Sequence, residues 1–536
     1  MARRLNIGDG GSWTFVNGDW CDGPGNSLSV PSDLIRLDGD GMQGHHYAFL
    51  HDRPLGDLRA DFEFALHAHS DVGLVFRASH PSRFGLIHFP NCGQASRAQH
   101  FWAGLSVMTG DGYLRLRELE MLRRVPSTDG IWLGANIELE GDELRARVGR
   151  NGRFNCRVSG IPSGGFIGLY VFGPGEIRKI RVEGEELPGP RWSEKPRQPR
   201  NWFHPSTETT HGVWQRPGNL VRIPGGDLLL NYNVQERPYR GKVTPLILRS
   251  RDDGASWESP ERLDLPYEGR ENWGHIHVFP DGEIRMLVPG DDGYALAETG
   301  DDGSTWSEPE AIEVGPTPEG VDRLHLGPQA LLNLENGGMV MFAYGRFNLS
   351  REDMSIFTWG SHHCQAFSCR STDGGRSWSD WVNLDGARDS QGRPVRGSLD
   401  LTEVCGVQTG DGSILAMIRP IYSPWMWETW SHDGGESWTP CVRGPFPGYA
   451  TPNMLRTESG RILVAHRLPG LTINTSPDDG NTWDRGTMID SAIWVMGSML
   501  EVSEDLVLYV YYDSFESLMR AQFIRVTEDG LLPGGT

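Results

Sequence analysis

Apolar and polar positions alternate along several segments in the first third of the chain. Between residues 61 and 76, Phe62 and Phe64 fall on one face of an extended strand, whereas Asp61 and Glu63 fall on the other. The segments 166–171 and 177–182 alternate in the same way. Strands with one apolar face bury that face by packing sheet against sheet. The pattern therefore predicts that residues 1–187 form an all-β unit, a β-sandwich.

The remainder of the chain repeats a different pattern, in which one apolar run, a short turn and a second apolar run follow one another. Turn residues of the glycine and aspartate type between two apolar runs are typical of β-hairpins. NLVRIPGGDLLL and GVQTGDGSILAMI are two of the six copies. The six copies centre on Gly226, Gly282, Gly338, Gly412, Gly460 and Asp505.

A second repeat follows each of these hairpins except the last. Its shared form is [ST]-x-D-x-G-x-x-W, as in SRDDGASW (250–257) and STDGGRSW (371–378). The aspartate can accept backbone hydrogen bonds across a turn, the glycine permits a positive φ, and the tryptophan can fill space beside the turn. The other copies lie at 299–306, 431–438 and 476–483.

These octapeptides resemble the Asp-boxes of the sialidase (neuraminidase) superfamily, also called BNR repeats. The resemblance covers residues 201–536 and implies a six-bladed β-propeller, built from six four-stranded units. Residues 188–200 are rich in proline and charge, so they are expected to be a linker. Residues 1–187 resemble the concanavalin-like jelly-roll domains that accompany carbohydrate enzymes. The fold class expected for the whole chain is all-β.

The composition of the chain argues against several classes of binding partner and cofactor. The chain of 536 residues has 50 basic and 71 acidic residues, a net charge of −21, which argues against nucleic-acid binding. No apolar run reaches the length of a membrane span, and no signal peptide is recognised at the start, so a cytoplasmic location without membrane contact is expected. The seven cysteines lack CxxC spacing and are expected to be reduced. No metal site and no cofactor are predicted.

The expected ligand site lies where the open ends of the hairpins meet, opposite their turns. Counting from the turns places Arg419 seven residues after Gly412 and Arg467 seven after Gly460, and Arg346 eight after Gly338. Crowded arginines require anions, and guanidinium groups grip carboxylates in two-pronged pairs. We expect a pocket for an acidic sugar, although each arginine could instead pair with an acidic residue between blades. The same end carries Arg216, His275, His325 and Glu403.

The resemblance assigns roles to some of these residues. Sialidases hold the substrate carboxylate with three arginines, which Arg216, Arg419 and Arg467 resemble. Glu403 matches the glutamate that polarises the family's nucleophile. Arg237 lies where another active-site arginine is often found.

Two parts of the family's site do not match. The nucleophilic tyrosine is expected just before a serine in the last repeat, where this chain has Gly497 before Ser498. The acid/base aspartate is expected in the loop after the first hairpin, which has Glu236 and Lys242 but no aspartate. Replacement proton donors and acceptors are His275, His325 and Tyr344, with Tyr422, Tyr449 and Asp513 as further candidates.

Three hypotheses about function follow. The first is an exo-acting glycoside hydrolase that removes a terminal acidic sugar from an oligosaccharide or glycoconjugate. The second is a polysaccharide lyase acting on a uronate-containing glycan with a histidine or tyrosine as the base, for which neither missing group is needed. The third is a non-catalytic glycan-binding protein.

Overall fold

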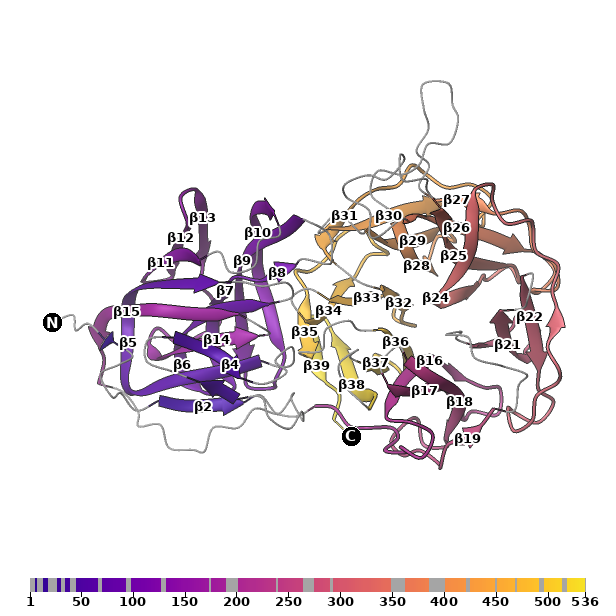
Figure 1. Cartoon of the computed structure of the whole chain (residues 1–536), viewed down its shortest axis with the longest axis horizontal. Coiled ribbons are helices and arrows are strands. Elements are labelled where there is room, and N and C mark those ends of the chain that lie inside the picture. The colour runs from indigo at the N-terminus through magenta and orange to yellow at the C-terminus, as the bar shows by residue number, and fades with distance from the viewer. Residues whose placement is uncertain are drawn as a thin grey trace, which may run out of the picture. The chain divides into compact units, whose positions relative to one another are not determined.

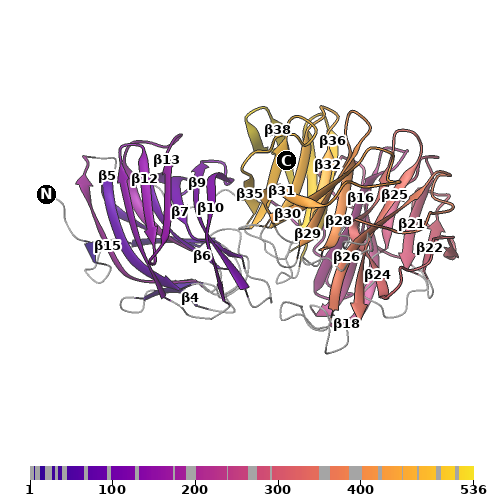
Figure 2. The same ribbon diagram turned by 90° about the horizontal axis from the view of Figure 1, so that it is seen from above.

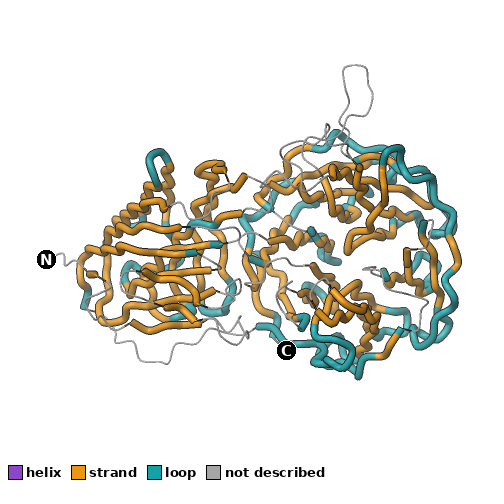
Figure 3. The backbone as a smooth tube through the Cα atoms, in the orientation of Figure 1, coloured by secondary structure: helices purple, strands orange, loops and turns teal. Residues whose placement is uncertain are grey.

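The computed structural model consists of strands joined by turns and loops (Figure 3), with no helix among the residues it describes. The all-β class predicted from the sequence is confirmed. No helix that could cross a membrane is present in this part of the chain. The described residues are 5–6, 13–17, 27–29, 34–38, 45–65, 70–92, 98–126, 132–172, 175–188, 201–237, 240–263, 274–289, 293–348, 362–384, 401–420, 425–448, 451–467, 470–490, 496–512 and 518–535.

The chain divides into two compact units. Unit 1 contains residues 1–201, 468–473 and 485–493, and unit 2 contains residues 202–467, 474–484 and 494–536. Apart from Pro188, the predicted linker at 188–200 lies outside the described residues.

Unit 1 is built around one long strand, β5 (His45–Ala65). The other strands of the N-terminal segment are β1 (Leu5–Asn6), β2 (Trp13–Asn17), β3 (Ser27–Ser29), β4 (Leu34–Asp38), β6 (Asp71–His80), β7 (Arg83–His88), β8 (Asn91–Cys92), β9 (Ala98–Thr109), β10 (Leu114–Pro126), β11 (Trp132–Glu140), β12 (Glu143–Val148), β13 (Gly152–Arg157), β14 (Gly165–Phe172) and β15 (Glu176–Glu186).

Strand β5 belongs to two groups of strands because its two halves have different partners. Its first half pairs with β2 and β14, and the ladder continues through β6, β7, β9 and β10. Its second half pairs with β11 and β15, and β11 continues to β12 and β13. Strand β10 also pairs with β35 (Thr487–Asp490), so residues from the fifth hairpin repeat complete unit 1.

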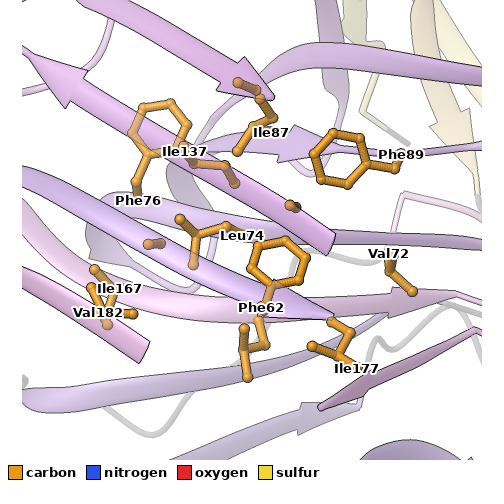
Figure 4. Packing of buried hydrophobic residues seen from close by; sticks show 14 of the residues in the cluster. Phe62, Val72, Leu74, Phe76, Ile87, Phe89, Ile137, Ile167, Ile177 and Val182 are labelled. Atoms are coloured by element: carbon orange, nitrogen blue, oxygen red, sulfur yellow. The ribbon is translucent and has the colours of Figure 1, made fainter. Parts of the chain in front are cut away.

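One apolar cluster joins the two groups of strands (Figure 4). Leu74 and Ile167 come from the first group, while Phe62, Ile137 and Ile177 come from the second. Phe62 and Phe64 are both buried, as their alternation with Asp61 and Glu63 predicts. Burial of a large apolar side chain contributes about 1.5–3 kcal/mol, so this shared cluster is the main reason that the two groups stay together.

A buried polar network lies on the other face of the first group. His88 contacts Asp71 through Nδ1 (2.6 Å to Oδ2) and Ser106 through Nε2 (2.9 Å to Oγ), and all three side chains are buried. Gly73 and Gly104 pair with His88 on its two sides, and a Cβ atom on either would meet the histidine. The ring therefore occupies space that Gly104 leaves, and Gly73 allows the backbone of β7 to approach closely. Because Ser106 is buried, we assign the network a structural role.

Unit 2 has the sheet arrangement of a β-propeller, with the labelled first strands of its sheets nearest the centre in Figure 1 and the sheets stacked side by side in Figure 2. The described residues of unit 2 form five separate four-stranded sheets. They are β16 (Trp214–Arg222), β17 (Leu228–Arg237), β18 (Arg240–Ser250) and β19 (Glu261–Arg262); β20 (His275–Val278), β21 (Ile284–Pro289), β22 (Tyr294–Glu298) and β23 (Glu310–Ala311); β24 (Val321–Asn333), β25 (Met339–Asn348), β26 (His362–Ser371) and β27 (Val382–Asn383); β28 (Leu401–Gln408), β29 (Ile414–Pro420), β30 (Trp425–Ser431) and β31 (Val442–Pro447); and β36 (Met496–Ser503), β37 (Leu506–Tyr512), β38 (Arg520–Thr527) and β39 (Gly530–Pro533).

The fifth hairpin repeat forms β32 (Asn453–Arg456) paired with β33 (Ile462–Arg467), and β34 (Leu471–Ser476) paired with β35. These strands are not a separate sheet, because β35 also pairs with β10. The first strands of the six hairpins contact one another in a closed cycle, in the order β16, β20, β24, β28, β32, β36 and back to β16.

The Asp-box repeats have the geometry that their residue types predict. In the third copy, Asp373 accepts hydrogen bonds from the backbone and hydroxyl of Ser377 and from the hydroxyl of Ser371. Gly375 has a φ of +87°, and Trp378 donates its Nε1–H to the Gly375 carbonyl. The aspartates of the other four copies accept the same hydroxyl bonds from the equivalent serine or threonine residues.

Candidate active site

Hydrogen bonds at the hairpin turns put the six repeats in a common register. In five repeats a glycine with positive φ donates its N–H to the carbonyl three residues earlier: Gly226, Gly282, Gly337, Gly412 and Gly460. In the sixth repeat Asp505 has positive φ at the corresponding turn. The position seven residues after the turn then lies at or next to the end of β21, β29, β33 and β37, and inside the longer strands β17 and β25. It is occupied by Asn233, Pro289, Tyr344, Arg419, Arg467 and Tyr512.

This register differs from the sequence-based one in the third hairpin. That turn contains two glycines, and Gly337 rather than Gly338 has the positive φ, at +81°. The residue equivalent to Arg419 and Arg467 is therefore Tyr344, and Arg346 lies two residues further along β25. From the sequence, either of two adjacent glycines could take the turn position. The hydrogen bond of the turn shows that Gly337 takes it.

Arg419 and Glu403 form an ion pair between β29 and β28. Nη1 of Arg419 lies 2.7 Å from Oε1 and 2.5 Å from Oε2 of Glu403, and only 12% and 14% of the two side chains are exposed. The hydroxyl of Thr402 donates to Glu403 Oε2 at 3.2 Å. The acidic partner of Arg419 is therefore a neighbour on the adjacent strand, and both residues of the pair are among those that the sequence singled out for the site.

Arg216 lies at the corresponding end of the first sheet, where it pairs with Asn233 across β16 and β17. Its guanidinium lies 4.9 Å from the ring centroid of Trp214 and 5.6 Å from that of Tyr512. Cation–π contacts of this kind stabilise a buried guanidinium without neutralising it. The Arg216 guanidinium therefore lies beside two aromatic rings.

Arg467 ends β33 and is 5% exposed. The preceding residue, His466, stacks on Phe446 with ring centroids 5.4 Å apart and contacts Asn474 Oδ1 through Nε2 at 2.6 Å. Burial lowers the pKa of His466 to about 4, despite the opposing effect of the Asn474 hydrogen bond. His466 is therefore neutral near pH 7, and Arg467 carries the charge at this end of the strand.

His325 and Tyr344 are partners across β24 and β25. Their rings are stacked, with centroids 5.3 Å apart and planes 22° apart, and both side chains are half-buried. The sequence singled out these two residues separately. The structure places them together as one aromatic pair at the level of Arg419 and Arg467.

His275 begins β20 and is buried, with 2% exposed. Its Nδ1 lies 3.0 Å from Oδ1 of Asn219 on β16. Sequence analysis missed Asn219, because it has no charge and lies within an apolar run. Its position seven residues before Gly226, matching His275 before Gly282, was the available signal.

Gly497, at the position expected for a nucleophilic tyrosine, is enclosed by its neighbours. A Cβ atom there would meet the Val510 carbonyl oxygen and would lie 2.7 Å from the Tyr509 ring and 2.8 Å from the Tyr511 Cβ. No side chain fits at this position without movement of β37. The packing around Gly497 therefore leaves no room for a tyrosine side chain.

Several predicted residues cannot be placed in the site. The side chains of Arg237 and Arg346 lie outside the described part of the chain, although their backbones end β17 and lie in β25. Tyr422, Tyr449 and Asp513 also lie outside it. Within the described ranges, no cluster of three or more histidine, cysteine, aspartate or glutamate side chains could hold a metal ion.

The repeat region is similar to one known domain family. Residues 280–494 match the model of the BNR repeat-like domain. No curated protein matches the chain.

Several solved structures are similar to this chain. A Hadza microbial sialidase, Hz136, is 16% identical with a TM-score of 0.46, over 89% of this chain and 94% of that one. An intramolecular trans-sialidase from Ruminococcus gnavus is 12% identical with a TM-score of 0.44, over 62% and 98%. A polysaccharide lyase described as an ulvanlyase is 11% identical with a TM-score of 0.40, over 86% and 96%. At these identities and TM-scores the similarity assigns no activity to this chain.

Proposed function

We propose that this chain is a carbohydrate-active enzyme that removes a terminal, carboxylate-bearing sugar from an oligosaccharide or glycoconjugate by hydrolysis. The observation that carries the proposal is the Arg419–Glu403 pair, with Arg467 at the same register position in the next hairpin. The strands that begin these two hairpins, β28 and β32, contact each other. The proposal takes the fifth repeat as a sixth propeller blade and the two strand groups of unit 1 as a β-sandwich.

Arginines are the residues expected to recognise the sugar carboxylate. Arg216, Arg419 and Arg467 are each at most 12% exposed in a chain with a net charge of −21. A planar guanidinium donates two parallel hydrogen bonds to a carboxylate, and charge-assisted bonds contribute about 1.5–3 kcal/mol each. In the proposal the ligand carboxylate accepts hydrogen bonds from these guanidinium groups. Arg237 and Arg346 are further proposed contacts, together with His325.

Hydrolysis requires a water molecule to add to the anomeric carbon while the glycosidic C–O bond breaks. The water gives up one proton, and the leaving oxygen takes one. We assign polarisation of the water to Glu403 and the proton transfers to His275 and Tyr344. A covalent intermediate on tyrosine is not part of the proposal, because Gly497 occupies the place of that side chain.

Elimination is the second candidate function, and the stacked His325–Tyr344 pair favours it. A lyase removes the proton beside a uronate carboxylate, which arginines neutralise, and a nearby base accepts it. A histidine and a phenol together provide an acceptor and a donor without two carboxylic acids. Glycan binding without turnover is the third candidate.

Mass spectrometry of products from a panel of acidic oligosaccharides separates the three functions. Hydrolysis yields a free acidic sugar, with the mass of one water added across the cleaved bond. Elimination yields an unsaturated sugar with no added water and an ultraviolet absorbance. Retention of every substrate intact, together with saturable binding on a glycan array, would instead support a binding protein.

A further inference from the structure

His275 and Asn219 form a pair whose atoms determine where the histidine keeps its proton. Nδ1 of His275 lies 3.0 Å from Oδ1 of Asn219, and both residues are buried. An amide oxygen can only accept a hydrogen bond, so Nδ1 carries the hydrogen. In neutral imidazole the lone pair is then on Nε2.

Asn219 is itself held in place by a closed circuit of hydrogen bonds. Its backbone N–H donates to Oδ1 of Asn231 at 2.9 Å, and Nδ2 of Asn231 donates to the carbonyl of Gly274, the residue before His275. Gly218 allows this approach, since a Cβ atom there would lie 2.5 Å from Nδ2 of Asn231. The circuit fixes the backbone of Asn219 beside that of Gly274 and His275, and so places the Asn219 side chain next to the histidine ring.

A second hydrogen bond holds the next residue of β16. The N–H of Leu220 donates to Oγ of Ser498 on β36 at 3.1 Å. Asn219, His275 and Ser498 all lie seven residues before the turn of their own hairpin. The strand that carries the amide is thus fixed from the sheets on both sides, by β20 and by β36.

His277, two residues along the same strand, shows the opposite arrangement. Its Nε2 lies 2.8 Å from Oδ1 of Asn333, so its hydrogen is on Nε2 and its lone pair on Nδ1. Two asparagines from two different sheets, β16 and β24, therefore select different tautomers in two histidines of β20. His277 can therefore serve as an internal reference when the tautomer of His275 is measured.

We propose that Asn219 is a positioning residue that holds His275 as the neutral tautomer with its lone pair on Nε2, which makes His275 a proton acceptor. The acceptor role rests on the proposed function, whereas the tautomer does not. A neutral amide suits this role, because it orients the ring without the negative charge by which a carboxylate would favour the imidazolium. In the proposed hydrolysis His275 takes the proton that the attacking water gives up.

The tautomers are measurable by NMR of protein labelled with ¹⁵N-histidine, near pH 7 and without substrate. Wild type is expected to show His275 with hydrogen on Nδ1 and His277 with hydrogen on Nε2, assigned with His275→Gln and His277→Gln. Asn219→Leu is expected to remove the Nδ1–H preference of His275 and leave His277 unchanged. Asn219→Asp keeps an oxygen acceptor at the same place, so it is expected to retain the Nδ1–H form.

The matched control is Asn333→Leu, which is expected to change only His277. On a substrate that wild type turns over, Asn219→Leu is expected to lower kcat about 10- to 100-fold with little change in KM, since it removes orientation of a proton acceptor. Asn333→Leu is expected to leave both constants unchanged.

Hydrogen on Nε2 of His275 in wild type, or an unchanged His275 spectrum in folded Asn219→Leu, would overturn the proposal. Equal kcat losses in Asn219→Leu and Asn333→Leu would overturn the acceptor role. Failure of wild type to turn over any acidic glycan would instead refute the proposed function, and the spectrum would still decide the tautomer.

Discussion

Nη1 of Arg419 contacts both carboxylate oxygens of Glu403, at 2.7 and 2.5 Å, across β29 and β28. Glu403 therefore holds the guanidinium group of Arg419 in place through a single nitrogen, Nη1. A residue that both pairs with a neighbour and faces the open end of its sheet can hold its position before a ligand arrives. Preorganisation of this kind lowers the cost of binding a charged group.

Arg419→Ala is expected to lower kcat/KM for an acidic glycan by about 100-fold or more, because two charge-assisted hydrogen bonds are lost. Glu403→Gln is expected to lower kcat more than it raises KM, since it removes the charge proposed to polarise water. Steady-state kinetics on a defined oligosaccharide measures both. Arg222→Ala is the matched control, because Arg222 pairs with Asp253 near the turn end of its hairpin. Full activity of Arg419→Ala would refute the assigned role.

Gly497→Tyr is not expected to restore a sialidase nucleophile. Even Gly497→Ala is expected to destabilise the protein by about 1–3 kcal/mol, because the new Cβ would meet the Val510 carbonyl and the Tyr509 ring. Thermal unfolding followed by circular dichroism measures the loss. Gly300→Ala is the control, since a Cβ there has no atom within 4 Å. Equal melting temperatures for the two variants would contradict the packing described for Gly497.

Glu428→Gln is expected to stabilise the protein in alkaline solution. Burial raises the pKa of Glu428 from 4.5 to about 7, so its contribution is favourable below about pH 4.5 and is lost as the pH rises through 7. At pH 8 the free energy of unfolding of Glu428→Gln is expected to exceed that of wild type by on the order of 1–2 kcal/mol. This is less than the full pKa shift would give, because the side chain is only partly buried and water screens its charge. Urea unfolding at pH 5 and pH 8 tests this. In the exposed control variant Glu310→Gln, the free energy of unfolding should differ from that of wild type by the same amount at both pH values.

The Asp-box aspartates are expected to make the protein sensitive to acid. Partial burial of Asp373 works against ionisation, but hydrogen bonds from Ser377 and Ser371 outweigh it and lower the pKa to about 2. Hydrogen bonds from Thr305 and Thr299 do the same for Asp301. Stability from these groups is present above about pH 4 and is lost as the pH falls towards 2.

Asp373→Asn is expected to be less stable than wild type at pH 7 by about 1–3 kcal/mol and to lose less stability on acidification. Chemical unfolding at pH 7, 4 and 3 gives both quantities. An acid-induced loss as large in the variant as in wild type would show that the Asp373 carboxylate does not contribute.

Local turn chemistry made most of the fold of unit 2 predictable. Glycines such as Gly412 and the octapeptides around Asp373 specify their own hydrogen bonds, so the amino-acid sequence alone is enough to locate hairpins and Asp-boxes. The third turn was misplaced by one residue because Gly337 and Gly338 are equally suitable in sequence, and Tyr344 rather than Arg346 takes the equivalent position.

Long-range contacts were not predictable in the same way. The pairing of β10 with β35 joins Leu114 to Met488, and nothing local to either segment specifies it. The candidate arginines could be found because their charge stands out among apolar strands. The contact of Asn219 with His275 and the stacking of His325 on Tyr344 could not, because they depend on which strands become neighbours.

The central claim is that the arginines at the open ends of the hairpins recognise the carboxylate of the substrate sugar. The most direct measurement compares kcat/KM for an acidic oligosaccharide that the enzyme cleaves with that for the same oligosaccharide after its carboxylate is reduced to an alcohol. Recognition of the carboxylate by arginine predicts a preference for the acidic form of about 100-fold or more in wild type, falling to a few-fold in Arg467→Ala. Equal turnover of the two substrates by wild type would contradict it.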